Sequence, residues 1–113
     1  MIIRGGENIY PKEIEDFLYT HPKVSDVQVI GVPDEQYGEE IMACIIPKEG
    51  ETVTAAELRE YSMARIAKHK VPRYFDFVDS FPMNAAGKIL KYKMREDAVK
   101  KLNLQKANEI VTA

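Results

Sequence analysis

Residues 24–46 read VSDVQVIGVPDEQYGEEIMACII, and this stretch decides the fold. Its first part, residues 24–32, alternates in part between apolar and polar side chains, as in a β-strand with one buried face. Its last part, residues 41–46, is continuously apolar, which favours a more deeply buried strand. Between them lie Pro33 and Gly38, residue types that are common in loops. We therefore predict two strands, joined by a loop over residues 33–38 and paired antiparallel.

The segments on either side of this pair alternate between strand-like and helix-like patterns. We predict a hairpin within residues 1–10 that turns at Gly5 and Gly6, followed by a helix from Pro11 to about His21. A second helix is predicted to be capped by Thr54 and Glu57, to bury Leu58 and Tyr61 and to end near Lys68. A strand over residues 74–78 and a helix along Leu90, Met94, Ala98 and Leu102 complete the prediction. The predicted fold class is α+β: a small three-stranded sheet packed with helices, plus an N-terminal β-hairpin. We expect one domain over residues 1–113, with a tail that frays after about residue 104.

Length and charge limit the possible functions. A chain of 113 residues is long enough for one modest core. Its net charge of -2 leaves no basic excess, so we predict no nucleic-acid binding. No apolar run approaches the roughly 20 residues that span a bilayer, so we predict no membrane span. The lone Cys44 excludes an intrachain disulfide and fits core packing, and with no visible signal peptide we predict a cytoplasmic protein.

The usual motifs for metal binding and acid–base catalysis do not fit this sequence. His21 and His69 have no partner at ligand spacing, so we expect both to be solvated and predict no metal site. The neighbouring carboxylates Glu39 and Glu40 are interpreted as part of a solvated polar face rather than as an acid–base pair. Neither group therefore predicts an active site.

The segment at residues 82–91, PMNAAGKILK, carries the clearest chemical signal. Gly87 relaxes the backbone limits of the bend, and Asn84 is able to hydrogen-bond within it. Lys88 then lies at the tip of a flexible loop, where its ammonium group is free to reach an anion. The segment is not a P-loop, because that motif requires glycine at position 82 and Ser or Thr at position 89. Taken alone, Lys88 also fits an ordinary surface lysine, and Gly5 with Gly6 an ordinary hairpin turn.

Three ordered segments together resemble a known superfamily. They are RGGENIYPKEIE at residues 4–15, VPDEQYGE at residues 32–39 and PMNAAGKILKYKMR at residues 82–95. They resemble signatures of the C-terminal domain of adenylate-forming (AMP-binding) enzymes, which include acyl- and aryl-CoA synthetases, adenylation domains of peptide synthetases and firefly luciferase. The resemblance covers about residues 1–102 and is greatest to the acyl-CoA synthetases.

The resemblance implies that the chain is the C-terminal lid domain of a larger AMP-forming acid–thiol ligase of fatty acid metabolism. In the first step a carboxylate attacks the α-phosphate of ATP, and Lys88 matches the lysine that assists it, with Asn84 and Gly87 supporting its loop. In the second step, after rotation of the small domain, a thiol displaces AMP. The turn made by Arg4, Gly5, Gly6 and Glu7 matches the loop that lines the thiol tunnel.

The same resemblance implies partners and cofactors outside this chain. The parent enzyme is expected to use ATP with Mg²⁺ and coenzyme A, and the chain to work with an N-terminal adenylation domain and with coenzyme A or a pantetheine carrier. The acyl pocket of the family lies in that larger domain, and its hinge segment would lie before Met1, so we expect the isolated chain to be inactive. The alternative is a stand-alone binding module that docks a carrier protein or an adenylation core in trans.

Overall fold

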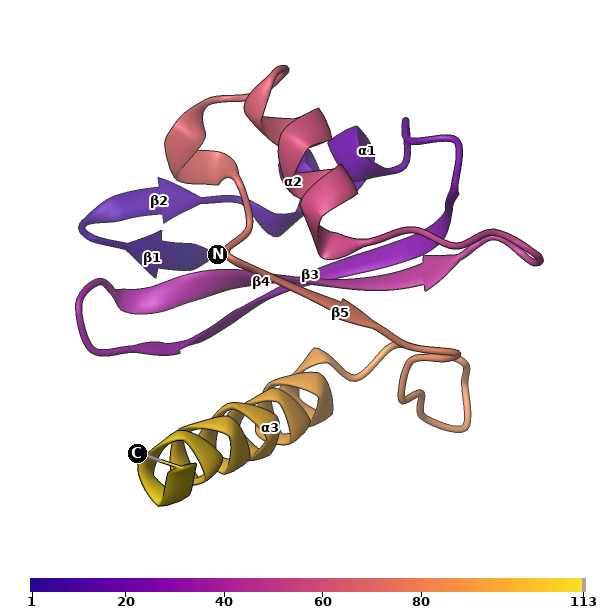
Figure 1. Ribbon diagram of the computed structural model, residues 1–113. Coiled ribbons are helices and arrows are strands. Elements are labelled where there is room, and N and C mark those ends of the chain that lie inside the picture. The colour runs from indigo at the N-terminus through magenta and orange to yellow at the C-terminus, as the bar shows by residue number, and fades with distance from the viewer. Residues whose placement is uncertain (113) are drawn as a thin grey trace. The chain divides into compact units, whose positions relative to one another are not determined.

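A computed structural model describes the backbone of residues 1–112 and the side chains of residues 1–103. The chain divides into two compact units, Met1–Ser80 and Phe81–Ala113, which are described in turn. The prediction of one domain over the whole chain stays a prediction. The first unit contains β1 (Ile2–Arg4), β2 (Glu7–Ile9), α1 (Pro11–Leu18), β3 (Val24–Asp34), β4 (Gly38–Pro47), α2 (Ala55–Met63), the short 3₁₀ helix η1 (Lys68–Lys70) and β5 (Tyr74–Phe77) (Figure 1).

The five strands form one sheet around β4. β3 pairs antiparallel with β4 from Val24↔Pro47 to Asp34↔Gly38, as the alternating pattern predicts. β5 pairs parallel with β4, and β1 joins β4 through a single antiparallel pair, Arg4↔Gly38. The α+β class is therefore confirmed, and the N-terminal hairpin of β1 and β2 belongs to the same sheet as the three longer strands.

The loop between β3 and β4 is shorter than predicted. Residues 33–38 were expected to form it, but the ladder continues through Pro33↔Glu39 and Asp34↔Gly38. The Asp34 carboxylate accepts hydrogen bonds from the amides of Gln36 (3.0 Å) and Tyr37 (2.9 Å), which stabilises a tight turn. Because the Asp34 carboxylate accepts hydrogen bonds from the amides of the turn, β3 and β4 can stay paired up to the first residue of the turn.

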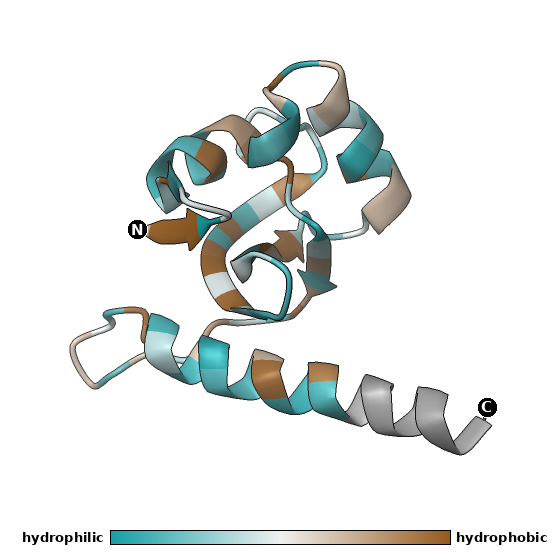
Figure 2. Ribbon diagram, turned by 90° about the vertical axis from the view of Figure 1, so that its left-hand side faces the viewer, coloured by the Kyte–Doolittle hydropathy of each residue, from teal (hydrophilic) through white to brown (hydrophobic). Residues whose placement is uncertain are grey.

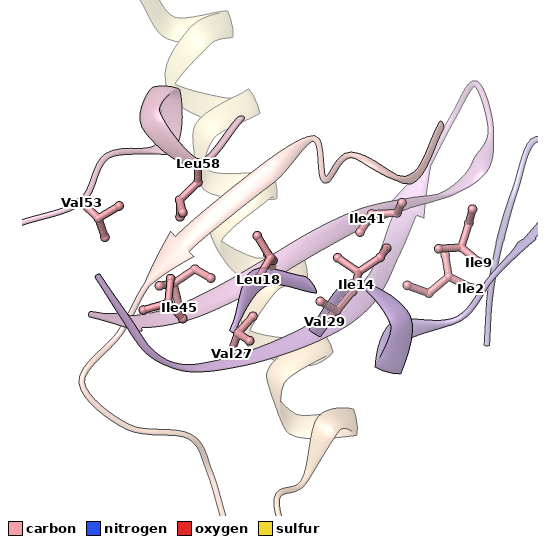
Figure 3. Close-up of a cluster of buried hydrophobic side chains, with 12 residues drawn as sticks. Ile2, Ile9, Ile14, Leu18, Val27, Val29, Ile41, Ile45, Val53 and Leu58 are labelled. Carbon is pink, nitrogen blue, oxygen red and sulfur yellow. The ribbon is translucent and has the colours of Figure 1, made fainter. Parts of the chain in front are cut away.

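The core of the first unit lies between the sheet and the two helices α1 and α2, which cover the same face (Figure 1). Ile14 and Leu18 from α1 and Leu58 from α2 are buried there, as their helical spacing predicts. Tyr61 is only partly buried and stacks on Phe17 at 5.3 Å between ring centroids. Figure 3 shows how the strands contribute to this cluster, whose buried members also include Ile2, Ile9, Val24, Val27, Val29, Ile41, Ala43, Ile45 and Val53.

Helix α2 is capped as predicted at its start but ends earlier, at Met63 rather than near Lys68. The buried Ser62 hydroxyl donates to the Leu58 carbonyl at 2.8 Å, a bond that competes with helix propagation. At the start, Thr54 Oγ1 accepts from the Glu57 amide at 3.1 Å. In a capping box the Glu57 carboxylate would accept from the Thr54 amide. Here it accepts instead from Lys23 Nζ at 3.1 Å, a residue that immediately precedes β3.

The second unit contains a short loop and the helix α3 (Lys91–Thr112). The helix begins one residue after Leu90, whose carbonyl accepts from the amides of Lys93 (3.1 Å) and Met94 (3.3 Å). Over the part of α3 whose side chains are described, Figure 2 shows hydrophobic bands between hydrophilic ones. Met94 and Ala98 of the predicted apolar stripe are buried. The backbone of α3 is helical to Thr112, and the expected fraying after about residue 104 stays a prediction. Among the described residues, no helix combines the length and the apolarity that crossing a membrane requires.

Replacing the helix cap tests the assignment of α2. We expect Thr54→Ala to lower the free energy of unfolding by about 1 kcal/mol, because the Glu57 amide loses its side-chain acceptor. Urea denaturation of the chain measures this change. Thr52→Ala, at another exposed threonine two residues earlier, is the matched control and should change stability by less than about 0.5 kcal/mol. Equal effects of the two substitutions would contradict the assignment.

Candidate functional site

The double-glycine turn joins β1 to β2 and has the backbone that its sequence predicts. Gly5 and Gly6 have φ values of +56° and +85°, and Arg4 pairs with Glu7 across the turn. Two successive positive φ values are the geometry of a tight hairpin turn that matches the twist of its strands. A Cβ on Gly5 would meet Tyr37 Cδ1 at 3.1 Å, whereas a Cβ on Gly6 would meet nothing within 4 Å. A side chain at position 5 is therefore disfavoured by both packing and backbone conformation, and a side chain at position 6 by backbone conformation alone.

Arg4 is held from two sides at the base of this turn. Its Nε donates to Glu40 Oε1 at 2.8 Å, and its guanidinium lies over the Tyr37 ring at 4.1 Å from the centroid. The hydrogen bond with Glu40 raises the pKa of the Arg4 guanidinium above its ordinary value. The Glu40 side chain is only 1% exposed, which corrects the interpretation of Glu39 and Glu40 as a solvated face. Burial of this carboxylate requires the arginine as its counter-charge.

Glu7 contacts a short basic segment that the sequence patterns missed. His69 Nε2 lies 3.1 Å from Glu7 Oε2, and the adjacent Lys70 Nζ lies 2.6 Å from Glu13 Oε1. These two pairs connect η1 to the hairpin and to α1. No local motif signals this arrangement, because the paired residues are far apart along the chain. Within residues 1–103, no group of three or more His, Cys, Asp or Glu side chains could hold a metal ion.

The other histidine is buried, which corrects the expectation that His21 is solvated. The residue is 7% exposed, and its Nδ1 accepts from the Lys23 amide at 3.1 Å. Its ring meets Tyr61 edge-on at 4.8 Å between centroids. Its Nε2 lies 4.0 Å from Glu57 Oε2, so His21 packs just beyond the end of α1 and beside a carboxylate of α2.

The second candidate segment forms a miniature hairpin around Asn84. The Asn84 amide donates to the Lys88 carbonyl, and the Gly87 amide donates to the Asn84 carbonyl, both at 3.0 Å. Asn84 Oδ1 also accepts from the amides of Ala86 (2.9 Å) and Lys88 (3.0 Å). Gly87 has a φ of +82°, and Met83 bridges Ile89 just outside the turn. The expected loose bend is thus closed by hydrogen bonds at both ends.

Lys88 combines an anchored backbone with an exposed side chain. Its amide and its carbonyl are both engaged by Asn84, and the residue is exposed. Within the described side chains, no carboxylate forms an ion pair with Lys88. A charged ammonium on a fixed backbone is suited to approaching an anion supplied from outside this unit.

A comparison with protein families now decides the identity of the domain. The family model described as "AMP-binding enzyme C-terminal domain" matches residues 13–88 of this chain. The chain belongs to this family. The matched region of this AMP-binding C-terminal domain ends at Lys88 and includes Asn84 and Gly87.

Similar curated proteins are acyl-CoA synthetases. The putative acyl-CoA synthetase YngI of Bacillus subtilis is 58% identical over 104 residues, which are 92% of this chain and 19% of that protein. The human mitochondrial medium-chain acyl-CoA ligase ACSF2 is 53% identical over 104 residues, 92% of this chain and 17% of that protein. This chain therefore spans about a fifth of the length of these relatives.

Two solved structures, one of them a fatty acyl CoA synthetase, share this fold. A Mycobacterium tuberculosis fatty acyl CoA synthetase matches with a TM-score of 0.78 and 44% identity, over 86% of this chain and 19% of that one. ATP-bound MatB from Rhodopseudomonas palustris matches with a TM-score of 0.81 and 38% identity, over 84% of this chain and 19% of that one. Both likenesses confirm the fold of an AMP-binding C-terminal domain.

Removing the arginine from the buried pair should destabilise the first unit. We expect Arg4→Leu to lower the free energy of unfolding by about 3 kcal/mol, because Glu40 is left as a buried charge without its partner. The exposed pair Lys12–Asp16 gives the control: Lys12→Leu should change stability by less than about 1 kcal/mol. Chemical denaturation of both variants measures the difference, and similar losses would contradict the importance of the buried pair.

Removing the Asn84 side chain should loosen the lysine hairpin. We expect Asn84→Ala to speed amide hydrogen exchange at Ala86 and Lys88 by about fivefold, the equivalent of one net hydrogen bond. Asn84→Asp keeps an oxygen acceptor at the same position and should retain most of the protection. Unchanged exchange in Asn84→Ala would show that the side chain does not hold this turn.

Proposed function

We propose that this chain is the C-terminal domain of an AMP-forming acid–thiol ligase, an acyl-CoA synthetase, and that it serves both half-reactions of that enzyme. The anchored, exposed Lys88 carries the proposal, because its geometry suits a charge presented to an external anion. Membership of the AMP-binding C-terminal family and the similar acyl-CoA synthetases support the assignment. ATP with Mg²⁺, coenzyme A and an N-terminal adenylation domain then belong to the complete enzyme.

Lys88 is proposed to act in the adenylation step. A substrate carboxylate oxygen forms a bond to the α-phosphorus of ATP, and the bond from that phosphorus to the departing oxygen of pyrophosphate breaks. The step brings two anions together and increases negative charge around the α-phosphate. The Lys88 ammonium, aimed at these oxygens, offsets that charge in a site from which water is excluded. Asn84 and Gly87 hold the backbone from which it reaches.

The turn from Arg4 to Glu7 is proposed to act in the thiol step. The sulfur of coenzyme A, or of a carrier-bound pantetheine, forms a bond to the acyl carbon, and the bond from that carbon to the phosphate oxygen of AMP breaks. AMP leaves with the electron pair of that bond, and the thiol proton passes to solvent. The pantetheine arm must pass close to the backbone of the protein, and Gly6 offers a backbone with no Cβ beside open space. Gly5 is packed against Tyr37 and fixes the turn, while Glu7 is placed beside it in β2.

Two substitutions should separate the half-reactions in the complete ligase. We expect Lys88→Ala to lower ATP–pyrophosphate exchange by about a hundredfold or more, because one charge-stabilising group is lost. Thiol transfer from a preformed acyl-adenylate should stay within a few-fold of wild type. Gly6→Leu should do the reverse, because its side chain blocks the thiol path while adenylation proceeds.

Each substitution has a matched control in this chain. Lys93→Ala removes another exposed lysine close to Lys88 and should leave exchange unchanged. Gly50→Leu places leucine on a glycine of similar φ (+78°) that also has open space, so it reproduces the backbone strain of Gly6→Leu away from the turn. If Lys88→Ala and Gly6→Leu reduced the same half-reaction equally, the assignment of separate roles would be wrong.

A further inference from the structure

The hairpin that carries the double-glycine turn has little backbone attachment to the sheet. β1 and β4 share one residue pair, Arg4↔Gly38, and the Gly5 amide donates to the Tyr37 carbonyl at 2.9 Å. The ladder between β3 and β4, in contrast, runs the length of both strands. The position of the turn therefore depends on side-chain contacts as well as on strand pairing.

Two successive glutamates of β4 provide those contacts. Glu39 Oε1 accepts from the Ile3 amide at 3.0 Å, and Glu40 Oε1 accepts from Arg4 Nε at 2.8 Å. Adjacent residues of a strand point to opposite faces, so the two carboxylates reach β1 from different sides. We call Glu39 and Glu40 the carboxylate clamp. It substitutes side-chain acceptors for the backbone ladder that β1 and β4 lack.

We infer that the carboxylate clamp and Arg4 are positioning residues for the thiol step. They fix the turn at Gly5 and Gly6 in the place where the pantetheine arm would pass, and they do so without touching substrate. The inference rests on the proposed function and extends it to residues of β4. It also gives Arg4 an indirect role. The Nε of Arg4 is bonded to Glu40 and one face of its guanidinium lies on the Tyr37 ring, and both of these partners belong to the first unit.

Glu40 is the member of the clamp that is hardest to replace. Its Oε1 accepts a second hydrogen bond, from the Ile41 amide at 3.0 Å, which fixes the carboxylate on its own strand. Its Oε2 is buried and has no hydrogen-bond partner within the described residues, so the arginine is the group that compensates its charge. A rigid acceptor on β4 thereby dictates where the Arg4 guanidinium, and with it the turn, must lie.

Gly31 makes room for the other member. This glycine of β3 faces Glu39, and a Cβ at its position would overlap the Glu39 carboxylate and come within 3.1 Å of Ile2 Cγ1. Its backbone is not in the left-handed region, so an alanine there introduces crowding without conformational strain. Gly31→Ala is therefore a second way to disturb the attachment of β1, acting through crowding of Glu39 and Ile2 and not through loss of a charge.

The test compares the two half-reactions in the complete ligase that contains this chain. We expect Glu40→Ala to slow thiol transfer from a preformed acyl-adenylate by between about tenfold and a hundredfold, the loss typical of a displaced positioning element. ATP–pyrophosphate exchange should stay within about twofold of wild type. Glu40→Gln keeps an oxygen acceptor of the same reach and should recover most of the lost rate.

Glu57→Ala is the matched control for general destabilisation. Glu57 also belongs to the first unit, pairs with a lysine and has a buried oxygen without a hydrogen-bond partner, but it lies on α2 away from β1. Its loss should leave the ratio of the two half-reactions unchanged. If Glu40→Ala does not fold, Gly31→Ala decides the question by the same ratio.

The outcomes separate this inference from the function on which it rests. Equal loss of both half-reactions in the clamp variants, or no loss of thiol transfer, would overturn the positioning role. If Lys88→Ala lowers exchange in the same assay while the clamp variants behave as wild type, only the clamp is wrong. If Lys88→Ala leaves exchange unchanged, the proposed function fails and the inference fails with it.

Discussion

The antiparallel pairing of β3 with β4 is the constraint on which the first unit depends. β4 also pairs with β1 and β5, so the register of this one strand places the hairpin and the last strand of the sheet. The side chains of β3 and β4 that face the helices form the part of the core that α1 and α2 cover (Figure 3). Because side chains alternate between the two faces of a strand, a one-residue slip would move every side chain of β4, Glu40 included, to the opposite face. The register of β4 therefore fixes the geometry of the double-glycine turn as well as the core.

The same strand carries charge where apolar residues would be simpler. Glu40 is buried at the start of β4, and its cost in solvation is offset by Arg4 across the sheet. A buried ion pair adds little net stability over apolar packing, but it specifies one arrangement of its partners. At this position the arrangement concerns a turn whose two glycines have positive φ and whose attachment to the sheet is short. Specificity of position explains the buried charge better than stability does.

The lysine hairpin of the second unit depends on local interactions instead. Asn84, Gly87 and Lys88 lie within five consecutive residues, and the hydrogen bonds that close the turn are made among them and Ala86. Such a motif needs no distant partner to hold its backbone. The sequence therefore predicted the bend, the positive φ of Gly87 and the hydrogen bonding of Asn84 within the bend. It did not predict how firmly the bend is closed, because two amides converging on one side-chain oxygen is a matter of three-dimensional geometry.

The sequence by itself determined the features that depend on neighbouring residues: the strand and helix periods, the turn at Gly5 and Gly6, the cap at Thr54 and the bend before Lys88. Tertiary structure decided which distant groups meet. Arg4 and Glu40 are 36 positions apart, and His69 reaches Glu7 from a segment with no recognisable pattern. Glu39 and Glu40 were expected to be solvated because charged side chains are usually exposed. Burial of one of them depends on strand register and on a counter-charge from another strand, and neither is a property of the local sequence.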